Sequence, residues 1–111
     1  MMGDGMTKIT YNAGKFCLSA QGHTGYGKSG SDILCAAVSC LMQTLSLALR
    51  ERGIRQSLIT DDSIPLYSVR AEPEAEQRYP CVITYSTITA GLRRLANDYQ
   101  EYIQYTEDKE A

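Results

Sequence analysis

The residues of this sequence that could carry out chemistry gather in one stretch, from Gly22 to Cys35. The stretch contains the single histidine of the chain, His23, and one of its four cysteines, Cys35, with a glycine-rich loop between them. A thiol is a nucleophile, and a nearby imidazole can take its proton and later protonate a leaving amine. The pair is therefore compatible with a thiol protease in which Cys35 attacks and His23 is the general base.

The position of Cys35 at the start of a helix favours this interpretation. Asp32 is the natural N-cap of the apolar helix that follows, because its side-chain oxygen can accept an unpaired backbone N–H. Cys35 then lies in the first helical turn, where exposed N–H groups and the positive end of the helix dipole stabilise a thiolate. Each residue also has a plainer interpretation, since a cysteine is usually packed, a lone histidine in a loop is usually solvated, and Asp32 caps the helix in either case.

The same stretch supports a second hypothesis, a phosphate-binding loop. Residues 22–29 fit the pattern G-x-x-x-x-G-K-[ST], so Lys28 would reach phosphates and Ser29 would ligate magnesium. In that motif the helix begins at the Lys-Ser step, whereas Gly30 and the capping residues delay it here. The motif also needs a parallel sheet with crossover helices, which the elements below do not supply. Two alternatives to the protease therefore stay open: a nucleotide-binding protein that uses residues 22–29, and a non-catalytic dimeric interaction module in which Cys35 is inert.

The hydrophobic pattern predicts two hairpins, each followed by a helix. The expected strands are residues 6–11, 15–21, 57–60 and 66–71. The first helix should span residues 33–49, and its first half is apolar nearly all round, so we expect it to be deeply buried. A second helix is indicated by apolar residues at steps of three or four between Tyr85 and Tyr102. The order β-β-α-β-β-α predicts an α+β fold with two layers, a mostly antiparallel four-stranded sheet and two helices.

Length and composition narrow the class of protein further. The chain has 111 residues, 43% of them hydrophobic, which fits one globular domain, expected over residues 6–105 with flexible ends at 1–5 and 106–111. The net charge of −2 differs from the excess of positive charge that is typical of nucleic-acid-binding proteins. The apolar runs are shorter than the ~20 residues that cross a bilayer, and the N-terminus does not resemble a secretion signal. We therefore expect a cytoplasmic protein with reduced thiols and no metal, since the cysteines lack zinc-site spacing.

Two segments of the sequence resemble the ribosomal-processing cysteine protease family, Prp. The family signature is Gly-His, a short flexible loop and Asp-Ile-Val-Cys-Ala-Ala-Val-Ser. This chain has Gly22-His23, a loop, and DILCAAVS over residues 32–39, with Leu34 replacing the usual valine. Weaker similarity at residues 91–92 and 99–103 extends the resemblance over about residues 6–105. Thr24 stands where the family usually has alanine.

The resemblance implies an activity and a set of site residues. Cys35 matches the nucleophile and His23 the general base, while Gly22, Asp32 and Ser39 match other signature positions. We expect Asp32 to cap the helix and orient His23, and Ser39 to make a contact one turn below the nucleophile. Backbone N–H groups at the helix start would form the oxyanion hole. No cofactor is implied.

The resemblance also implies a substrate and an assembly. Family members remove the short N-terminal extension of large-subunit ribosomal protein twenty-seven, cutting after a hydrophobic segment that ends in paired phenylalanines, and they form homodimers. Because four of the ten residues from Gly22 to Ser31 are glycine, we expect residues 24–31 to be mobile without ligand. His23 would then lie beyond hydrogen-bond reach of Cys35 until substrate binds.

Overall fold

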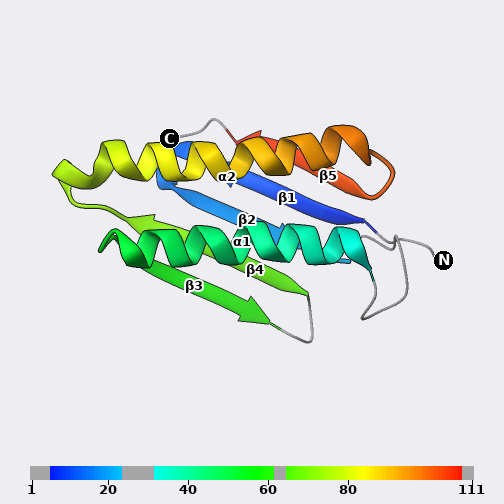
Figure 1. Ribbon diagram of the computed structural model, residues 1–111, viewed down its shortest axis with the longest axis horizontal. Helices are drawn as coiled ribbons and strands as arrows, with labels where there is room; N and C mark the ends of the chain where they lie inside the picture. The colour runs from blue at the N-terminus through cyan, green and yellow to red at the C-terminus, as the bar shows by residue number, and fades with distance from the viewer. Residues whose placement is uncertain (1–5, 24–31, 62–64, 109–111) are drawn as a thin grey trace.

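The predicted α+β fold class is confirmed by the computed structural model, which describes residues 6–23, 32–61 and 65–108 (Figure 1). Two helices cover one face of a single sheet, in the order β-β-α-β-β-α-β. The strands are β1 (Thr7–Asn12), β2 (Cys17–Gln21), β3 (Arg55–Asp61), β4 (Leu66–Glu72) and β5 (Ile103–Asp108). The helices are α1 (Ile33–Glu51) and α2 (Arg78–Asp98), and two short 3₁₀ turns span Ala13–Lys15 and Ala75–Gln77.

The described sheet has five strands rather than the four that the sequence predicts. Its order is β3-β4-β2-β1-β5, with antiparallel pairs except for β1 and β5, which run parallel. β5 pairs with β1 from Thr7↔Ile103 to Asn12↔Asp108, so it includes residues 106–108, which were expected in the flexible end. β5 alternates in its first half, where Ile103 is buried and Tyr105 is half-buried, whereas its exposed second half, residues 106–108, has no apolar side chain and is held by backbone pairing with β1.

The hydrophobic core lies between the sheet and the two helices. Along β1, Ile9 and Tyr11 point into the core while Lys8 and Thr10 are exposed, as the alternation predicts. Tyr85 of α2 is fully buried, its ring stacks on Tyr11 at 5.6 Å, and its hydroxyl donates to the carbonyl of Val69 at 3.1 Å. Burial raises the pKa of Tyr85. A single aromatic side chain therefore ties α2 to two strands of the sheet.

α1 begins where the sequence predicts, at the Asp32 cap, and ends at Glu51, two residues before Gly53, which has a positive φ of 69°. One stripe of α1 is buried against the sheet: Leu34, Val38, Met42, Leu45 and Leu49. The opposite face is exposed, so the expectation of a deeply buried first half is wrong for the single chain. By length and composition alone, α1 is also the one helix of the described residues that could cross a membrane.

α2 begins at Arg78, two turns before the first residue of the predicted pattern, Tyr85. Pro80 is its third residue, a position in the first turn where the missing N–H has no helical partner to lose. The preceding 3₁₀ turn has a capping box between Glu74 and Gln77, which leads the chain into the helix. Three β-branched threonines of α2, which lower helix propensity, each donate a hydroxyl hydrogen bond to a backbone carbonyl of the preceding turn: Thr84, Thr87 and Thr89.

Candidate active site

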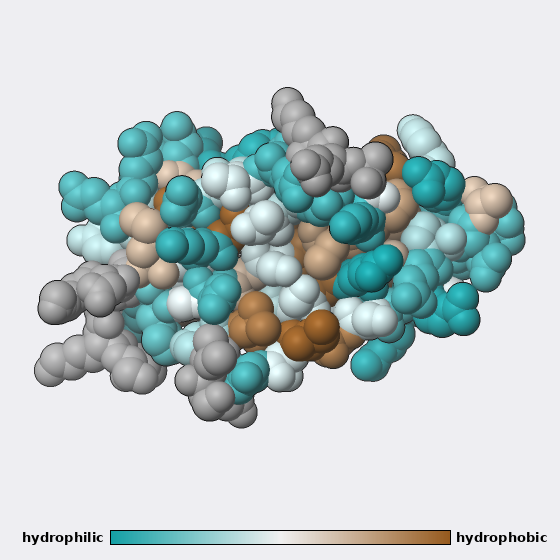
Figure 2. Space-filling view, turned by 180° about the vertical axis from the view of Figure 1, so that it is seen from behind, coloured by the Kyte–Doolittle hydropathy of each residue, from teal (hydrophilic) through white to brown (hydrophobic). Residues whose placement is uncertain are grey.

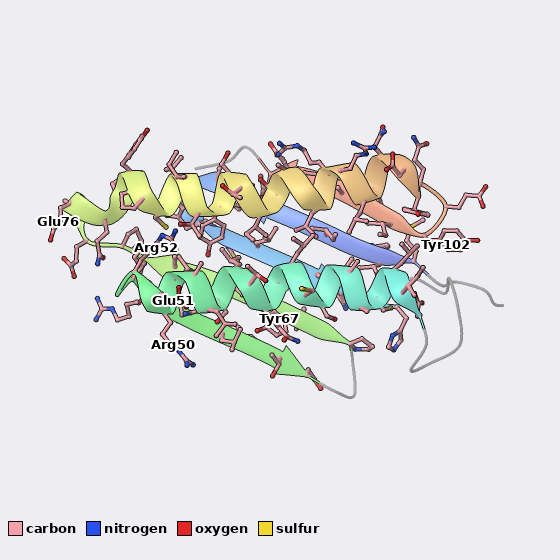
Figure 3. The ribbon with its side chains drawn as sticks, in the orientation of Figure 1. Arg50, Glu51, Arg52, Tyr67, Glu76 and Tyr102 are labelled. Atoms are coloured by element: carbon pink, nitrogen blue, oxygen red, sulfur yellow. The ribbon has the colours of Figure 1, made fainter. Side chains whose placement is uncertain are left out.

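A cleft of about 500 Å³ lies between α1 and the strands β2, β3 and β4, and it contains both His23 and Cys35. The other lining residues are Thr7, Ala20, Gly22, Val38, Ser39, Met42, Gln43, Thr60, Asp61, Pro65, Leu66 and Tyr67. Tyr67 lies beside the middle of α1 (Figure 3). The fold thus brings together four of the five predicted site residues: Gly22, His23, Cys35 and Ser39.

Gly22 holds the histidine end of the cleft in place. Its N–H donates to the carbonyl of Pro65 at 2.8 Å, and its own carbonyl accepts from the Thr7 hydroxyl at 3.0 Å. Its φ of +95° is in the left-handed region, and a Cβ at this position would lie 2.6 Å from the carbonyl oxygen of Met6. Only glycine fits this backbone without strain, so Gly22 positions His23 at the end of β2.

Asp32 holds the cysteine end of the cleft. One oxygen of its carboxylate accepts from the backbone N–H groups of Leu34 and Cys35, both at 3.0 Å. The predicted role as N-cap is therefore confirmed, and Cys35 is the third residue of α1. Asp32 itself is buried and does not line the cleft, and its predicted role in orienting His23 stays a prediction.

The first backbone N–H groups after the helix cap are not free to form the expected oxyanion hole. Asp32 takes the N–H groups of Leu34 and Cys35 with its side chain and that of Ala36 with its carbonyl, at 3.1 Å. An amide that already donates within the protein is not free to stabilise an oxyanion. The expectation is therefore wrong for these three amides.

The row of α1 residues that follows Cys35 forms one wall of the cleft. Ser39 comes one turn after Cys35, and Gln43 one turn after Ser39, so the three lie on the same helix face. The buried side chains of Val38 and Met42 add an apolar floor. At the far end, Gln56 of β3 is bonded to Ser46 of α1 through two hydrogen bonds of 2.8 and 2.9 Å, which fix the strand against the helix.

The sequence did not single out the β3 and β4 side of the cleft. Thr60 and Asp61 come from β3, and Leu66 and Tyr67 from β4. Their spacing gives no chemical motif, and they line the same cleft as Cys35 because the sheet order places β4 beside β2. The strands predicted at residues 57–60 and 66–71 indicated a hairpin but not its closeness to the cleft.

The phosphate-loop hypothesis disagrees with this fold. α1 begins at Ile33, four residues beyond Ser29, so its N-terminus does not coincide with the Lys-Ser step of the motif. The neighbours of β2 in the sheet are β1 and β4, and both are antiparallel to it. Lys28 and Ser29 themselves, and the predicted mobility of residues 24–31, lie outside the described residues, and the separation of His23 and Cys35 stays a prediction.

The four cysteines are free thiols in the structure, and they differ in environment. Cys40 is exposed, Cys17 and Cys35 are half-buried, and Cys81 is buried. Burial raises the pKa of Cys81 to about 11, so it is unsuited to act as a nucleophile. Within residues 6–23, 32–61 and 65–108, no group of three histidine, cysteine or acidic side chains could hold a metal ion.

Comparison with known proteins agrees with the cysteine chemistry of the cleft. The profile of the family described as "Cysteine protease Prp" matches residues 6–104. A curated relative from Mycoplasma pneumoniae, "Ribosomal processing cysteine protease Prp", is 29% identical and aligns over 94% of this chain and 97% of its own.

Solved structures share the fold. A Staphylococcus aureus ribosomal processing protease Prp with a covalently linked product peptide has a TM-score of 0.77 at 23% identity, covering 93% of this chain and 98% of its own. A Streptococcus mutans protein has a TM-score of 0.76 at 24% identity, covering 98% of this chain and 100% of its own. The Staphylococcus aureus protease with a substrate peptide has a TM-score of 0.72 at 21% identity, with coverage of 93% and 98%.

Proposed function

Because the chain belongs to the cysteine protease Prp family, we propose that it removes the N-terminal extension of a ribosomal protein with Cys35 as nucleophile and His23 as general base. The observation that carries this proposal is the cleft that holds both side chains. His23 follows β2 and Cys35 lies in the first turn of α1, and no other histidine exists in the chain. Gly22 positions His23 through its backbone hydrogen bonds, and Asp32 positions Cys35 through its carboxylate, which accepts from the Cys35 N–H.

The proposed reaction has two steps. His23 takes the thiol proton as the sulfur of Cys35 attacks the scissile carbonyl, and a tetrahedral intermediate forms. The carbon–nitrogen bond breaks as His23 returns the proton to the leaving amine, which leaves a thioester on Cys35. Water then attacks the thioester, with His23 as base, and the carboxylate product and the thiol are released. The Staphylococcus aureus relative was solved with a covalently linked product peptide, which supports a covalent route.

The walls of the cleft suit an apolar segment of substrate. Val38, Met42 and Tyr67 offer apolar surface beside Cys35, and Pro65 and Leu66 extend it. A hydrophobic segment that ends in phenylalanines, as the family's substrate does, would bury its side chains there. We therefore propose large-subunit ribosomal protein twenty-seven with its extension as the substrate.

The experiment is incubation of the purified chain with the extended and the trimmed ribosomal protein, followed by mass spectrometry. We expect one cut in the extended form and none in the trimmed form. Cys35→Ala and His23→Ala should abolish the cut. The matched control is Cys40→Ala, a thiol on the same helix that does not line the cleft. Cleavage by Cys35→Ala at the wild-type rate would refute the proposal.

We further propose that the chain acts in the cytoplasm as a homodimer, as the family resemblance implies. Ribosomal proteins are made in that compartment, and a thiol nucleophile stays reduced there.

A further inference from the structure

The edge strand β3 has apolar side chains that the core does not use. Seven large hydrophobic side chains are exposed in the described residues, and the two that do not lie on a helix, Leu58 and Ile59, are neighbours on β3. Leu58 is 49% exposed and Ile59 is 58% exposed. Because successive side chains of a strand point to opposite faces, one of the two lies on the helix side of the sheet and the other on the open side.

The pairing of β3 with β4 assigns a side to each residue. Leu58 pairs with Val69, whose side chain is fully buried in the core between the sheet and the helices. Residues directly opposite each other in an antiparallel pair have their side chains on the same face, so Leu58 lies on the helix side. Ile59 pairs with Ser68 and therefore lies on the open side. Figure 2 shows the open side, with hydrophobic surface along the lower margin, which β3 forms in Figure 1.

Leu58 continues the cleft along the flank of α1. The helix and β3 run in opposite directions (Figure 1), and contacts at two points fix their alignment. Thr60 lines the cleft together with Gln43, while Gln56 is bonded to Ser46 at 2.8 and 2.9 Å. Leu58 is the helix-side residue of β3 between these two points. Its side chain therefore extends the cleft along the strand, away from the catalytic pair.

The surface around Leu58 suits an apolar side chain. Tyr67 is diagonal to Leu58 across the strand pair, lines the cleft and packs against the core. Diagonal side chains of an antiparallel pair are about 7–8 Å apart, so one apolar group can lie over both. Gln43 and Thr60 beside them are uncharged. An apolar side chain would be removed from water here, whereas a charged one would lose water without gaining a counter-charge from these residues.

We propose that Leu58 forms an additional substrate subsite, which binds an apolar side chain of the extension about four residues before the scissile bond. The inference rests on the proposed function, in which Cys35 attacks that bond and the hydrophobic segment precedes it. From Cys35 to Gln43 the helix advances eight residues, about 12 Å. An extended peptide advances about 3.3 Å per residue, so a substrate that follows the flank of α1 reaches Leu58 after about four residues.

The test compares Leu58→Ala with Ile59→Ala in the cleavage of synthetic peptides that carry the extension and the cleavage site of the ribosomal protein. The two residues are neighbours on one strand with similar exposure but opposite faces, so Ile59→Ala is the matched control. Leu58→Ala should raise KM about tenfold and leave kcat unchanged, because it removes an apolar contact made equally in the ground state and the transition state. Ile59→Ala should keep the wild-type KM and kcat.

A second set of peptides locates the contact, with each residue of the extension before the cut replaced in turn by alanine. At one position, about three to five residues before the cut, alanine should raise KM about tenfold for the wild type. The same peptide should leave the KM of Leu58→Ala nearly unchanged, because the contact is already lost. If alanine at every position had the same effect on both enzymes, Leu58 would not contact the extension and the inference would be wrong.

Circular dichroism establishes that each variant is folded, and Leu58→Thr, which keeps a high strand propensity, replaces Leu58→Ala if that variant unfolds. Equal KM values for the Leu58 and Ile59 variants would overturn the inference, and so would a loss confined to kcat. In either case, cleavage by the wild type that Cys35→Ala abolishes would leave the proposed function standing. A folded wild type that cuts none of the peptides would contradict the proposed function, and the inference with it.

Discussion

Substitution of Gly22 by alanine tests how the fold positions His23. The new methyl group would lie 2.6 Å from the carbonyl oxygen of Met6, and the atom it meets is backbone, which cannot rotate away. Either the β1 segment or the Gly22 segment must move. Movement would weaken the hydrogen bonds from Thr7 at 3.0 Å and to Pro65 at 2.8 Å, which hold the chain just before the imidazole.

The magnitude follows from three contributions to the free energy of unfolding. A φ of +95° costs an L-residue about 1–2 kcal/mol. Two weakened hydrogen bonds cost about 1 kcal/mol each. The sum is about 3–4 kcal/mol, which corresponds to a Tm lower by about 12–16 °C in a domain of this size. A shift of the imidazole by about 1 Å would reduce kcat/KM about a hundredfold.

The control is Gly53→Ala, at the end of α1. Gly53 also has a positive φ, +69°, but a Cβ there meets nothing within 4 Å. It should lose only about 1–2 kcal/mol and keep wild-type kcat/KM. The assays are thermal unfolding and cleavage of the extended ribosomal protein. If the two variants were equally stable and equally active, the tight approach at Gly22 would not be what positions His23.

The other predictions concern the thiols and the helix cap. Iodoacetamide at pH 7 should modify Cys35 at least tenfold faster than Cys40, measured by peptide mass spectrometry, and equal rates would argue against an activated thiolate. Asp32→Ala should lower the free energy of unfolding by about 1–2 kcal/mol, and Asp32→Asn by much less, because asparagine also caps a helix; equal losses in denaturant unfolding would show that the cap is not the reason. Because burial raises the pKa of Cys81 from 9.0 to about 11, its contribution to stability is fully present below pH 9 and is lost as the pH rises through about 11. Thermal unfolding should therefore show a steeper loss of Tm between pH 9 and 11 in the wild type than in Cys81→Ala, and parallel curves would contradict this.

Local patterns in the sequence were sufficient for most of the fold. The alternation of Ile9 and Tyr11 identified β1, and Asp32 marked the start of α1, since capping depends on neighbouring residues alone. β5 was missed because its pairing with β1 is between residues about 96 apart and its own sequence is acidic. The start of α2 was missed because threonine and proline weaken its first turns, and tertiary packing overrides that weakness.

In the candidate site, too, the sequence predicted the features that neighbouring residues determine and missed those that long-range packing determines. The motif around His23 and Cys35 indicated cysteine chemistry, but the presence of Tyr67 and Asp61 in the cleft depends on sheet order, which no local pattern contains. Which amides at the helix start could serve an oxyanion depends on the direction of the Asp32 carboxylate, which accepts from Leu34 and Cys35 and which no sequence pattern contains. The exposed face of α1 shows that an apolar helix predicts burial without saying which molecule supplies it.

Cleavage of the extended ribosomal protein by the Cys35→Ala and Cys40→Ala variants tests the central claim most directly. Both variants remove one sulfur from α1, but only Cys35 lines the cleft with His23. We predict that Cys40→Ala trims the substrate at the wild-type rate and that Cys35→Ala, folded by circular dichroism, leaves it intact. Trimming by folded Cys35→Ala, or an intact substrate with the folded wild type, would contradict the account.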